Sequence, residues 1–105
     1  GVTFSGGEPF EQAEALLPLA LALKEQGYHL MAFTGYTLEE LLQKPVCRPL
    51  LETLNLLVDG PYVEAEKSLD LRFRGSRNQR ILNIPACRAH GWQPVLDALN
   101  ESVER

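Results

Sequence analysis

The stretch that decides the fold is Val2-Thr3-Phe4, which runs directly into Ser5-Gly6-Gly7-Glu8-Pro9. Residues 2–4 are apolar and β-prone, and the two glycines and the proline end this strand in a turn. A helix is expected over residues 10–26, because apolar side chains recur there at helical spacing. These side chains are Ala13, Leu16, Leu17, Ala20 and Leu23. Gly27 suits the left-handed cap of this helix, and Pro18 inside it predicts a bend or a later start.

The same alternation continues along the chain. Residues 28–33 form a second apolar run, and Thr37 with Glu40 then fits a capping box that opens a short helix. A further helix is expected over about residues 48–54, and it leads into a third apolar run at residues 56–58. Strands that alternate with helices are typical of βαβ units, so the chain is predicted to be an α/β protein with about three parallel strands.

After residue 61 the pattern loosens. Residues 62–70 are expected to form a loop, residues 71–74 a half-exposed strand and residues 80–84 another extended piece, so the sheet gains edge extensions. Residues 94–104 place their apolar side chains on one face, which predicts an amphipathic helix. Parallel sheets normally need both faces covered, and this chain has few helices for that. A fragment of a larger protein, or a dimer, is therefore expected.

Composition excludes several classes of protein. The 105 residues suit one small domain, with 45 % hydrophobic and 23 % charged residues as in ordinary globular proteins. No run of apolar residues is long enough to span a membrane. Ten basic against fourteen acidic side chains give a net charge of −4, which disfavours nucleic-acid binding. Cys47 and Cys87 stand in no metal-binding spacing, so we expect free thiols, a reducing cytoplasmic setting and no metal site in this chain.

Each predicted parallel strand is followed by a loop with unusual residues: residues 5–9, 34–36 and 59–61. Ligands bind at the carboxyl ends of parallel strands, so three such loops along one edge favour a binding site. Gly6 and Gly7 lack a Cβ, which lets a ligand approach the backbone, and the carbonyls at a strand end can accept hydrogen bonds from an ammonium group. The alternative is that these loops are plain strand-to-helix turns.

Four segments resemble, in order and spacing, radical S-adenosylmethionine enzymes, and more narrowly the activating enzymes of anaerobic (class III) ribonucleoside-triphosphate reductase. They are Ser-Gly-Gly-Glu-Pro at residues 5–9, Thr-Gly-Tyr-Thr-Leu-Glu-Glu-Leu at 34–41, Leu-Val-Asp-Gly-Pro-Tyr at 57–62 and the Arg-rich stretch at 68–80. The resemblance covers about residues 2–84. It divides the chain into residues 1–84, the C-terminal part of a radical S-adenosylmethionine core, and residues 85–105, an extension with the amphipathic helix.

The resemblance implies an incomplete partial (β/α) barrel that binds S-adenosylmethionine beside a 4Fe-4S cluster. In such enzymes the reduced cluster cleaves the S–C5′ bond homolytically, and the 5′-deoxyadenosyl radical abstracts a hydrogen from a glycine Cα of the partner, the large subunit of anaerobic ribonucleotide reductase. The implied contacts to S-adenosylmethionine come from the first loop and from the next two strand ends. These residues are Ser5, Gly6, Gly7, Glu8, Pro9, Thr34 and Asp59.

The departure from the family concerns the cluster. The family holds it by a Cys-x-x-x-Cys-x-x-Cys segment upstream of Gly-Gly-Glu-Pro, and Cys47 and Cys87 cannot supply three thiolates. We therefore expect a fragment of the activase, without catalytic residues of its own, inactive alone and with weak or no affinity for S-adenosylmethionine. The alternative is a non-enzymatic α/β remnant that binds a partner or itself. Exposed apolar surface on the strand at residues 2–4 favours self-association.

Four of the ten basic side chains lie within nine positions. They are Arg72, Arg74, Arg77 and Arg80. One interpretation is a docking surface for an acidic partner, or contacts to the carboxylate and ribose of S-adenosylmethionine. The other is a charged strand edge that discourages pairing between sheets.

Overall fold

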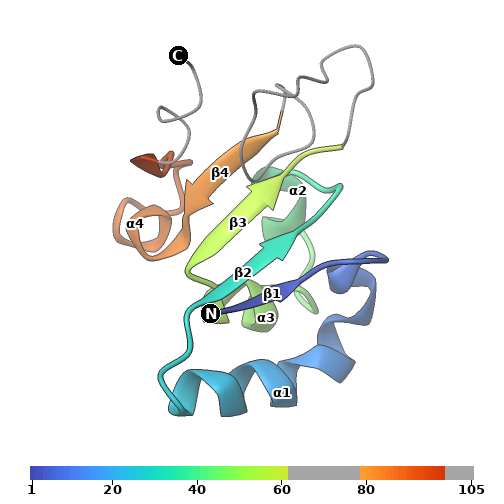
Figure 1. Cartoon of the computed structure of the whole chain (residues 1–105). Helices are drawn as coiled ribbons and strands as arrows, with labels where there is room; N and C mark the ends of the chain where they lie inside the picture. The colour runs from blue at the N-terminus through green and yellow to red at the C-terminus, as the bar shows by residue number, and fades with distance from the viewer. Residues whose placement is uncertain (62–78, 99–105) are drawn as a thin grey trace, which may run out of the picture.

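The computed structural model describes residues 1–61 and 79–98 of the 105-residue chain. Within them lies a four-stranded sheet whose strands follow sequence order (Figure 1). The strands are β1 (Val2–Phe4), β2 (Leu30–Phe33), β3 (Leu56–Asp59) and β4 (Arg80–Asn83). The first three are parallel, and β4 pairs antiparallel with β3. The mixed α/β architecture and the three parallel strands that the sequence predicted are both present.

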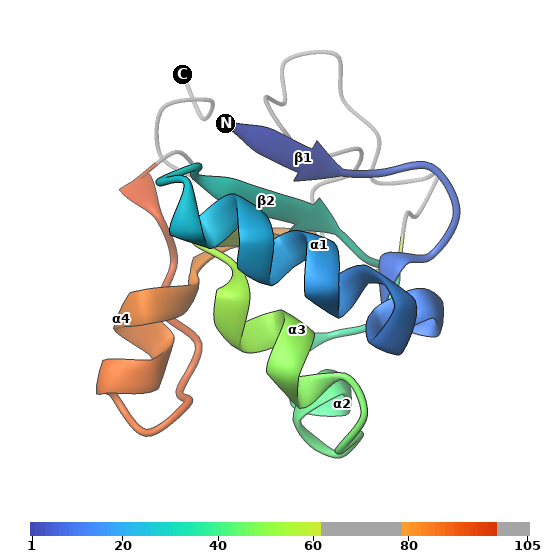
Figure 2. The same ribbon diagram turned by 90° about the horizontal axis from the view of Figure 1, so that it is seen from below.

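The helices of the described residues gather on one face of the sheet (Figure 2). They are the 3₁₀-helix η1 (Pro9–Gln12) and the α-helices α1 (Ala13–Glu25), α2 (Leu38–Leu42), α3 (Arg48–Thr53) and α4 (Ile84–Ala89). None of these helices is both long and apolar enough to cross a bilayer. The described part of the chain is thus a two-layer arrangement of helices over a sheet.

The core lies between the two layers. Alternate strand residues face the helices, because side chains alternate across a strand. The buried members of this face are Phe4, Leu30, Ala32, Leu57 and Leu82, and they join Ala20, Leu50 and Leu51 of the helices in one cluster. The opposite face is also apolar: Val58 and Ile81 are buried outside that cluster, and Met31, Phe33 and Leu56 are half-buried. Both faces of the sheet therefore carry apolar side chains.

Two local signals gave the correct helix boundaries. Thr37 and Glu40 form the capping box, with the Thr37 Oγ1 accepting from the Glu40 N–H and the Glu40 carboxylate accepting from the Thr37 N–H. Gly27 follows α1 with a φ of +85°. The helix predicted over residues 10–26 differs at its start: η1 covers the first turn, and α1 continues through Pro18. A proline inside a helix costs about 3 kcal/mol, which tertiary packing has to offset.

The C-terminal part differs from the prediction. The Asn83 Oδ1 accepts from the Ala86 N–H at 3.0 Å and caps α4, a helix that the sequence analysis missed. Residues 94–97 were expected to begin a helix, but they run beside β4 instead. The Asn83 N–H donates to the Val95 carbonyl (2.9 Å), and the Asp97 N–H donates to the Ile81 carbonyl (2.8 Å). The rest of that predicted helix, and the predicted strand at residues 71–74, lie outside the described residues.

Candidate functional site

The carboxyl ends of β1, β2 and β3 meet at one edge of the sheet, because the three strands are parallel. Antiparallel β4 begins at this same edge, where Arg80 lies opposite Asp59 in the register. The loops that follow β1, β2 and β3 therefore lie along this edge, as the sequence predicted, and the start of β4 lies there as well. Gln79 immediately precedes β4, so the antiparallel pairing of β4 brings it to this edge too. The sequence analysis did not predict Gln79 as a site residue.

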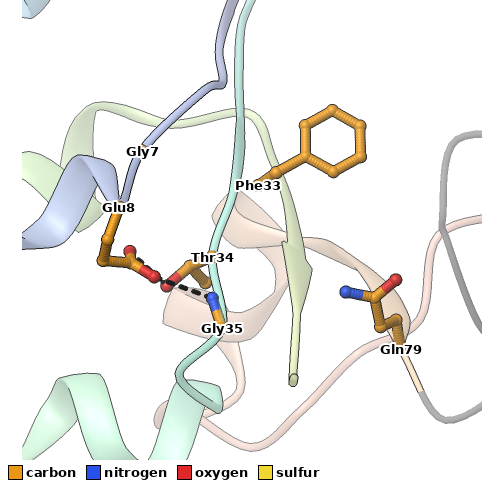
Figure 3. A pocket seen from close by; sticks show the side chains of 6 residues that line it. All are labelled: Gly7, Glu8, Phe33, Thr34, Gly35 and Gln79. Carbon is orange, nitrogen blue, oxygen red and sulfur yellow. Dashed lines mark hydrogen bonds between the residues drawn. The ribbon is translucent and has the colours of Figure 1, made fainter. Parts of the chain in front are cut away.

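Glu8 joins the first two loops. Its carboxylate accepts from the Thr34 hydroxyl (2.7 Å) and from the Gly35 N–H (2.8 Å), both at the end of β2 (Figure 3). The same carboxylate caps η1 by accepting from the Phe10 N–H at 3.2 Å. Both carboxylate oxygens are thus engaged within the chain. This arrangement makes Glu8 a clamp that holds the loop after β1 against the loop after β2.

The two glycines before Glu8 adopt left-handed backbone conformations, with φ of +72° at Gly6 and +35° at Gly7. Such conformations favour glycine, because a Cβ strains them. A Cβ built on Gly6 would meet no atom within 4 Å, and one on Gly7 would meet only the Gln12 side chain, at 3.9 Å. The conformation of the loop, and not crowding, therefore requires glycine, and the backbone is open to an incoming group.

A cavity of about 230 Å³ lies beside this loop (Figure 3). It is lined by Gly7, Glu8, Phe33, Thr34, Gly35 and Gln79. The Gln79 side chain donates from Nε2 to the Gly60 carbonyl at 2.9 Å, so it is held by the loop after β3. Sites for whole small ligands typically enclose roughly 300–1,000 Å³, so the described residues form room for part of such a ligand.

The structure places the residues predicted to bind S-adenosylmethionine around two different cavities, except for Asp59. Gly7, Glu8 and Thr34 line the cavity just described. A second cavity of about 220 Å³ adjoins the same loop, and its lining includes Ser5, Gly6 and Pro9. Asp59 lines neither of these two cavities.

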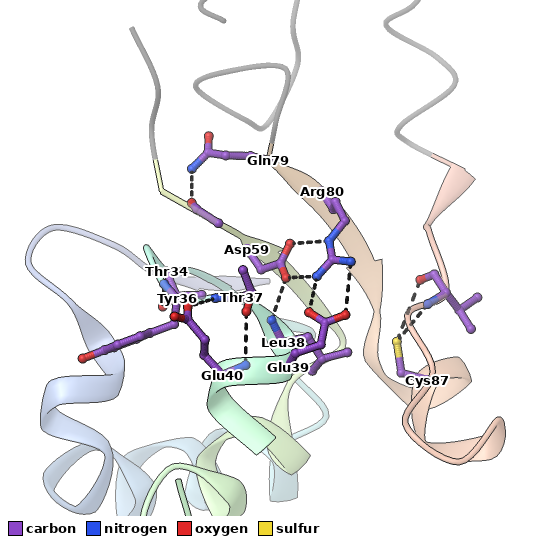
Figure 4. A network of polar contacts seen from close by, with 12 residues as sticks. Thr34, Tyr36, Thr37, Leu38, Glu39, Glu40, Asp59, Gln79, Arg80 and Cys87 are labelled. Carbon is purple, nitrogen blue, oxygen red and sulfur yellow. Dashed lines mark hydrogen bonds and ion pairs between the residues drawn. The ribbon is translucent and has the colours of Figure 1, made fainter. Parts of the chain in front are cut away.

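Asp59 has its own set of partners at the helix-covered face of the sheet (Figure 4). Only 1 % of it is exposed, and its carboxylate accepts from the Leu38 N–H at the start of α2 (2.7 Å) and from the Arg80 Nε–H (3.0 Å). Arg80 also donates from Nη2 to Asp59 and to Glu39, the latter at 2.8 Å. The hydrogen bond from Arg80 lowers the pKa of Glu39. This network joins β3, β4 and α2.

Of the four arginines predicted to bind a partner, Arg80 alone is among the described residues, and Arg72, Arg74 and Arg77 lie outside them. The Arg80 side chain is 31 % exposed and bonds two carboxylates of its own chain. Its role in partner binding stays a prediction, and the structure gives its guanidinium an internal role.

Tyr36 provides a second link between the loops, which sequence reasoning missed. Its hydroxyl donates to the Glu11 carboxylate of η1 at 2.6 Å, and the Lys44 Nζ lies 4.9 Å from the centre of its ring. This hydrogen bond to Glu11 is the main cause that raises the pKa of Tyr36 to about 12. The sequence signal for this contact was the spacing of Glu8 and Glu11. It places one carboxylate at the cap of η1 and a second one within that helix.

The two cysteines do not form a cluster site. The Cys47 thiol donates to the Phe10 carbonyl at 3.5 Å, and the Cys87 sulfur accepts from the Val95 N–H at 3.3 Å. Burial raises the pKa of both thiols, which disfavours the thiolate that binds iron. Within residues 1–61 and 79–98, no group of three or more His, Cys, Asp or Glu side chains is placed to hold a metal ion. The described residues therefore do not fit a 4Fe-4S cluster.

Comparison with known proteins identifies relatives. Residues 1–82 match the protein family described as a 4Fe-4S single cluster domain. The anaerobic ribonucleoside-triphosphate reductase-activating protein of Haemophilus influenzae is 34 % identical over 85 residues, covering 77 % of this chain and 54 % of the relative. The protein of that name from Escherichia coli K12 is 32 % identical over 88 residues, or 80 % and 56 %. The chain thus spans about half the length of these curated relatives. No solved structure matches it.

The Glu8 clamp predicts a local effect on the second loop. We expect Glu8→Ala to lower the free energy of unfolding by about 1–2 kcal/mol, because the cap of η1 and the acceptor for the Gly35 N–H are both lost. Amide hydrogen exchange at Gly35 should become faster. Glu25→Ala, at an exposed position in the last turn of α1, serves as the control and should leave that exchange unchanged. Equal exchange at Gly35 in both variants would contradict the clamp.

The Tyr36–Glu11 hydrogen bond predicts a pH dependence. An ordinary tyrosine has a pKa of about 10, so the raised pKa stabilises the folded state fully below about pH 10, and this contribution is lost as the pH rises through about 12. Ultraviolet titration should show a late-ionising tyrosine that Tyr36→Phe removes and that Glu11→Gln shifts to lower pH. Glu14→Gln, on the exposed side of α1, should leave the titration unchanged. A Glu11→Gln curve identical to that of the parent chain would rule out the assigned cause.

Proposed function

From the premise that the chain belongs to the family of 4Fe-4S single cluster domains, we propose that it is part of a radical S-adenosylmethionine activase that generates a glycyl radical on anaerobic ribonucleotide reductase. Its matched relatives are named as activating proteins of that reductase. In this proposal residues 1–84 form the C-terminal part of an incomplete partial (β/α) barrel, and residues 85–105 form an extension. Three parallel strands with helices on one face support such a barrel segment.

The observation that carries the proposal is the loop at Gly6 and Gly7, held by Glu8 beside a cavity at the ends of parallel strands. In our proposal the backbone of this loop binds the methionyl ammonium of S-adenosylmethionine. Glu8 then acts as a positioning residue, because its carboxylate already accepts three hydrogen bonds. Ser5, Pro9 and Thr34 complete the immediate surroundings. A contact from Asp59 would require its ion pair with Arg80 to open.

The described residues do not supply the ligands for a 4Fe-4S cluster. Cys47 and Cys87 are buried in separate surroundings, so we derive no chemical step through a 4Fe-4S cluster held by this chain. We propose that the chain is inactive alone and that the parent protein provides the cluster. The partner proposed from the relatives is the large subunit of anaerobic ribonucleotide reductase, with the arginines at positions 72, 74, 77 and 80 as its docking surface.

Titration with S-adenosylmethionine tests whether the loop at Gly6 and Gly7 binds this ligand. We expect weak binding, seen by NMR at millimolar ligand as shifts of the Gly6, Gly7 and Gly35 amides. Gly6→Ala should abolish these shifts, and Gly27→Ala should keep them. The two glycines are a matched pair, since both have a positive φ and a Cβ added to either would meet no atom within 4 Å. Absence of any shift, or equal loss in both variants, would contradict binding at this loop.

Reconstitution with iron and sulfide under anaerobic conditions tests whether the chain alone can hold a cluster. The chain should acquire no stoichiometric cluster, and incubation with S-adenosylmethionine, a reductant and the reductase should give no glycyl radical signal in electron paramagnetic resonance. A cluster that disappears in Cys47→Ala or Cys87→Ala would show that the inactive-alone proposal is wrong.

A non-enzymatic role through self-association has one supporting observation. Among the described residues, β1 pairs only with β2 and leaves its outer side as a sheet edge. Unpaired edges promote pairing with another chain. We expect the isolated chain to be a dimer or larger in light scattering, and Thr3→Pro, at an exposed position of β1, to weaken that association. A monomer over a tenfold range of concentration would refute self-association.

A further inference from the structure

A second surface lies on the helical layer, away from the cavity at the strand ends. Residues of α1, α3 and α4 line a groove of about 380 Å³ there. Figure 2 shows α1 and α3 next to one another, with α4 beside them. We call this groove the α1–α3 groove and define it by Leu17, Leu21, Lys24, Pro49, Glu52 and Arg88. The Lys24 Nζ donates to the Asn55 Oδ1, and Asn55 immediately precedes β3. The groove therefore reaches toward the edge where the strands begin, opposite to the candidate site.

The walls of the α1–α3 groove are apolar and open. Leu21 is 50 % exposed, Pro49 is exposed and Leu17 is half-buried. An exposed leucine is ordinary by itself, but here it borders a hollow that can receive another side chain. Burial of such a side chain against Leu21 and Pro49 would remove apolar surface from water on both partners.

Positive charge gathers around the same groove. The described residues contain five lysines and arginines, and three of them, Lys24, Arg48 and Arg88, lie in or next to the groove. Glu52 is the carboxylate among the residues that line it, and it lies 3.4 Å from the Arg48 Nε. This excess of cations occurs in a chain whose net charge is −4. A partner that brings carboxylates would complement it.

Trp92 holds two of these cations in place. The Arg48 Cζ lies 5.0 Å and the Arg88 Cζ 6.0 Å from the centre of its ring. Trp92 itself has a φ of +66°, an unusual conformation for a large side chain. Stacking on the indole restricts both guanidinium groups before any partner arrives, so less rotamer freedom is lost when they bind carboxylates.

We propose that the α1–α3 groove docks a segment of a partner protein that carries an apolar side chain flanked by carboxylates. The apolar walls receive the side chain, and Lys24, Arg48 and Arg88 pair with the acidic groups. This combination favours an acidic, amphipathic peptide over a nucleic acid, whose phosphates would leave the leucines uncovered. The proposal does not rest on the function proposed above, because the groove shares no residue with the candidate site.

A synthetic peptide tests the groove. The probe is acetyl-Glu-Glu-Leu-Ala-Glu-Leu-Leu-Glu-Glu-amide, and its counterpart has every Glu replaced by Lys. Trp92 is the chain's one tryptophan, so its fluorescence reports binding next to the groove. We expect the acidic peptide to bind, with affinity that falls as salt is raised, and the basic peptide not to bind.

Two matched pairs of variants locate the contact. Leu21→Ala should weaken binding of the acidic peptide about tenfold, whereas Leu19→Ala should not, although both leucines are 50 % exposed on α1. Lys24→Glu should likewise weaken it about tenfold, whereas Lys44→Glu, away from the groove, should not. Circular dichroism confirms that each variant is folded.

Three outcomes would overturn the proposal. The first is no binding of the acidic peptide at millimolar concentration, or stronger binding of the basic one. The second is an equal effect within either matched pair of variants. The third is dissociation of a chain oligomer by Leu21→Ala in light scattering, which would assign the groove to a second copy of this chain.

Discussion

Three hydrogen-bond donors converge on the carboxylate of Glu8, and the geometry of the candidate site depends on them. The Phe10 N–H comes from η1, while the Thr34 hydroxyl and the Gly35 N–H come from the end of β2. The loop before Glu8 contains two glycines in left-handed conformations, so its own backbone gives it little stiffness. A charged acceptor that bridges two elements restores that stiffness, since hydrogen bonds to ionised groups are stronger than neutral ones. The Glu8 carboxylate therefore holds together the two loops that line the cavity.

Asp59 shows how a second carboxylate at the same sheet edge serves a different purpose. It is nearly fully buried, and a buried carboxylate is costly unless it is paired and hydrogen-bonded. Arg80 and the Leu38 N–H meet that requirement, and Glu39 completes the surroundings of the guanidinium. The result attaches antiparallel β4 and the start of α2 to β3. Glu8 thus organises the loops, whereas Asp59 organises the elements behind them.

Helix α1 connects the two surfaces that we assign to ligands and partners. It follows η1, the helix that Glu8 caps, and it carries Leu17, Leu21 and Lys24 of the α1–α3 groove. The helix is 13 residues long and packs against α3. Its start adjoins the loop cavity through η1, and its last turns carry Leu21 and Lys24 of the groove. A partner in the groove and a small ligand at the loop would therefore contact different ends of one helix without competing for the same residues.

The sequence alone determined the local features of this protein, because their causes lie within a few residues. The strand–turn–helix start, the capping box of Thr37 and the cap at Gly27 follow from such short-range signals. The cap of α4 at Asn83 was equally local and was missed, because residues 80–84 were interpreted as extended. Only the tertiary structure decided that Glu8 bonds the end of β2, Asp59 the start of α2 and Tyr36 the η1 helix, since these bonds join residues 21 to 27 positions apart. It likewise set residues 94–97 beside β4, where backbone pairing with the sheet prevailed over the helical pattern of their side chains.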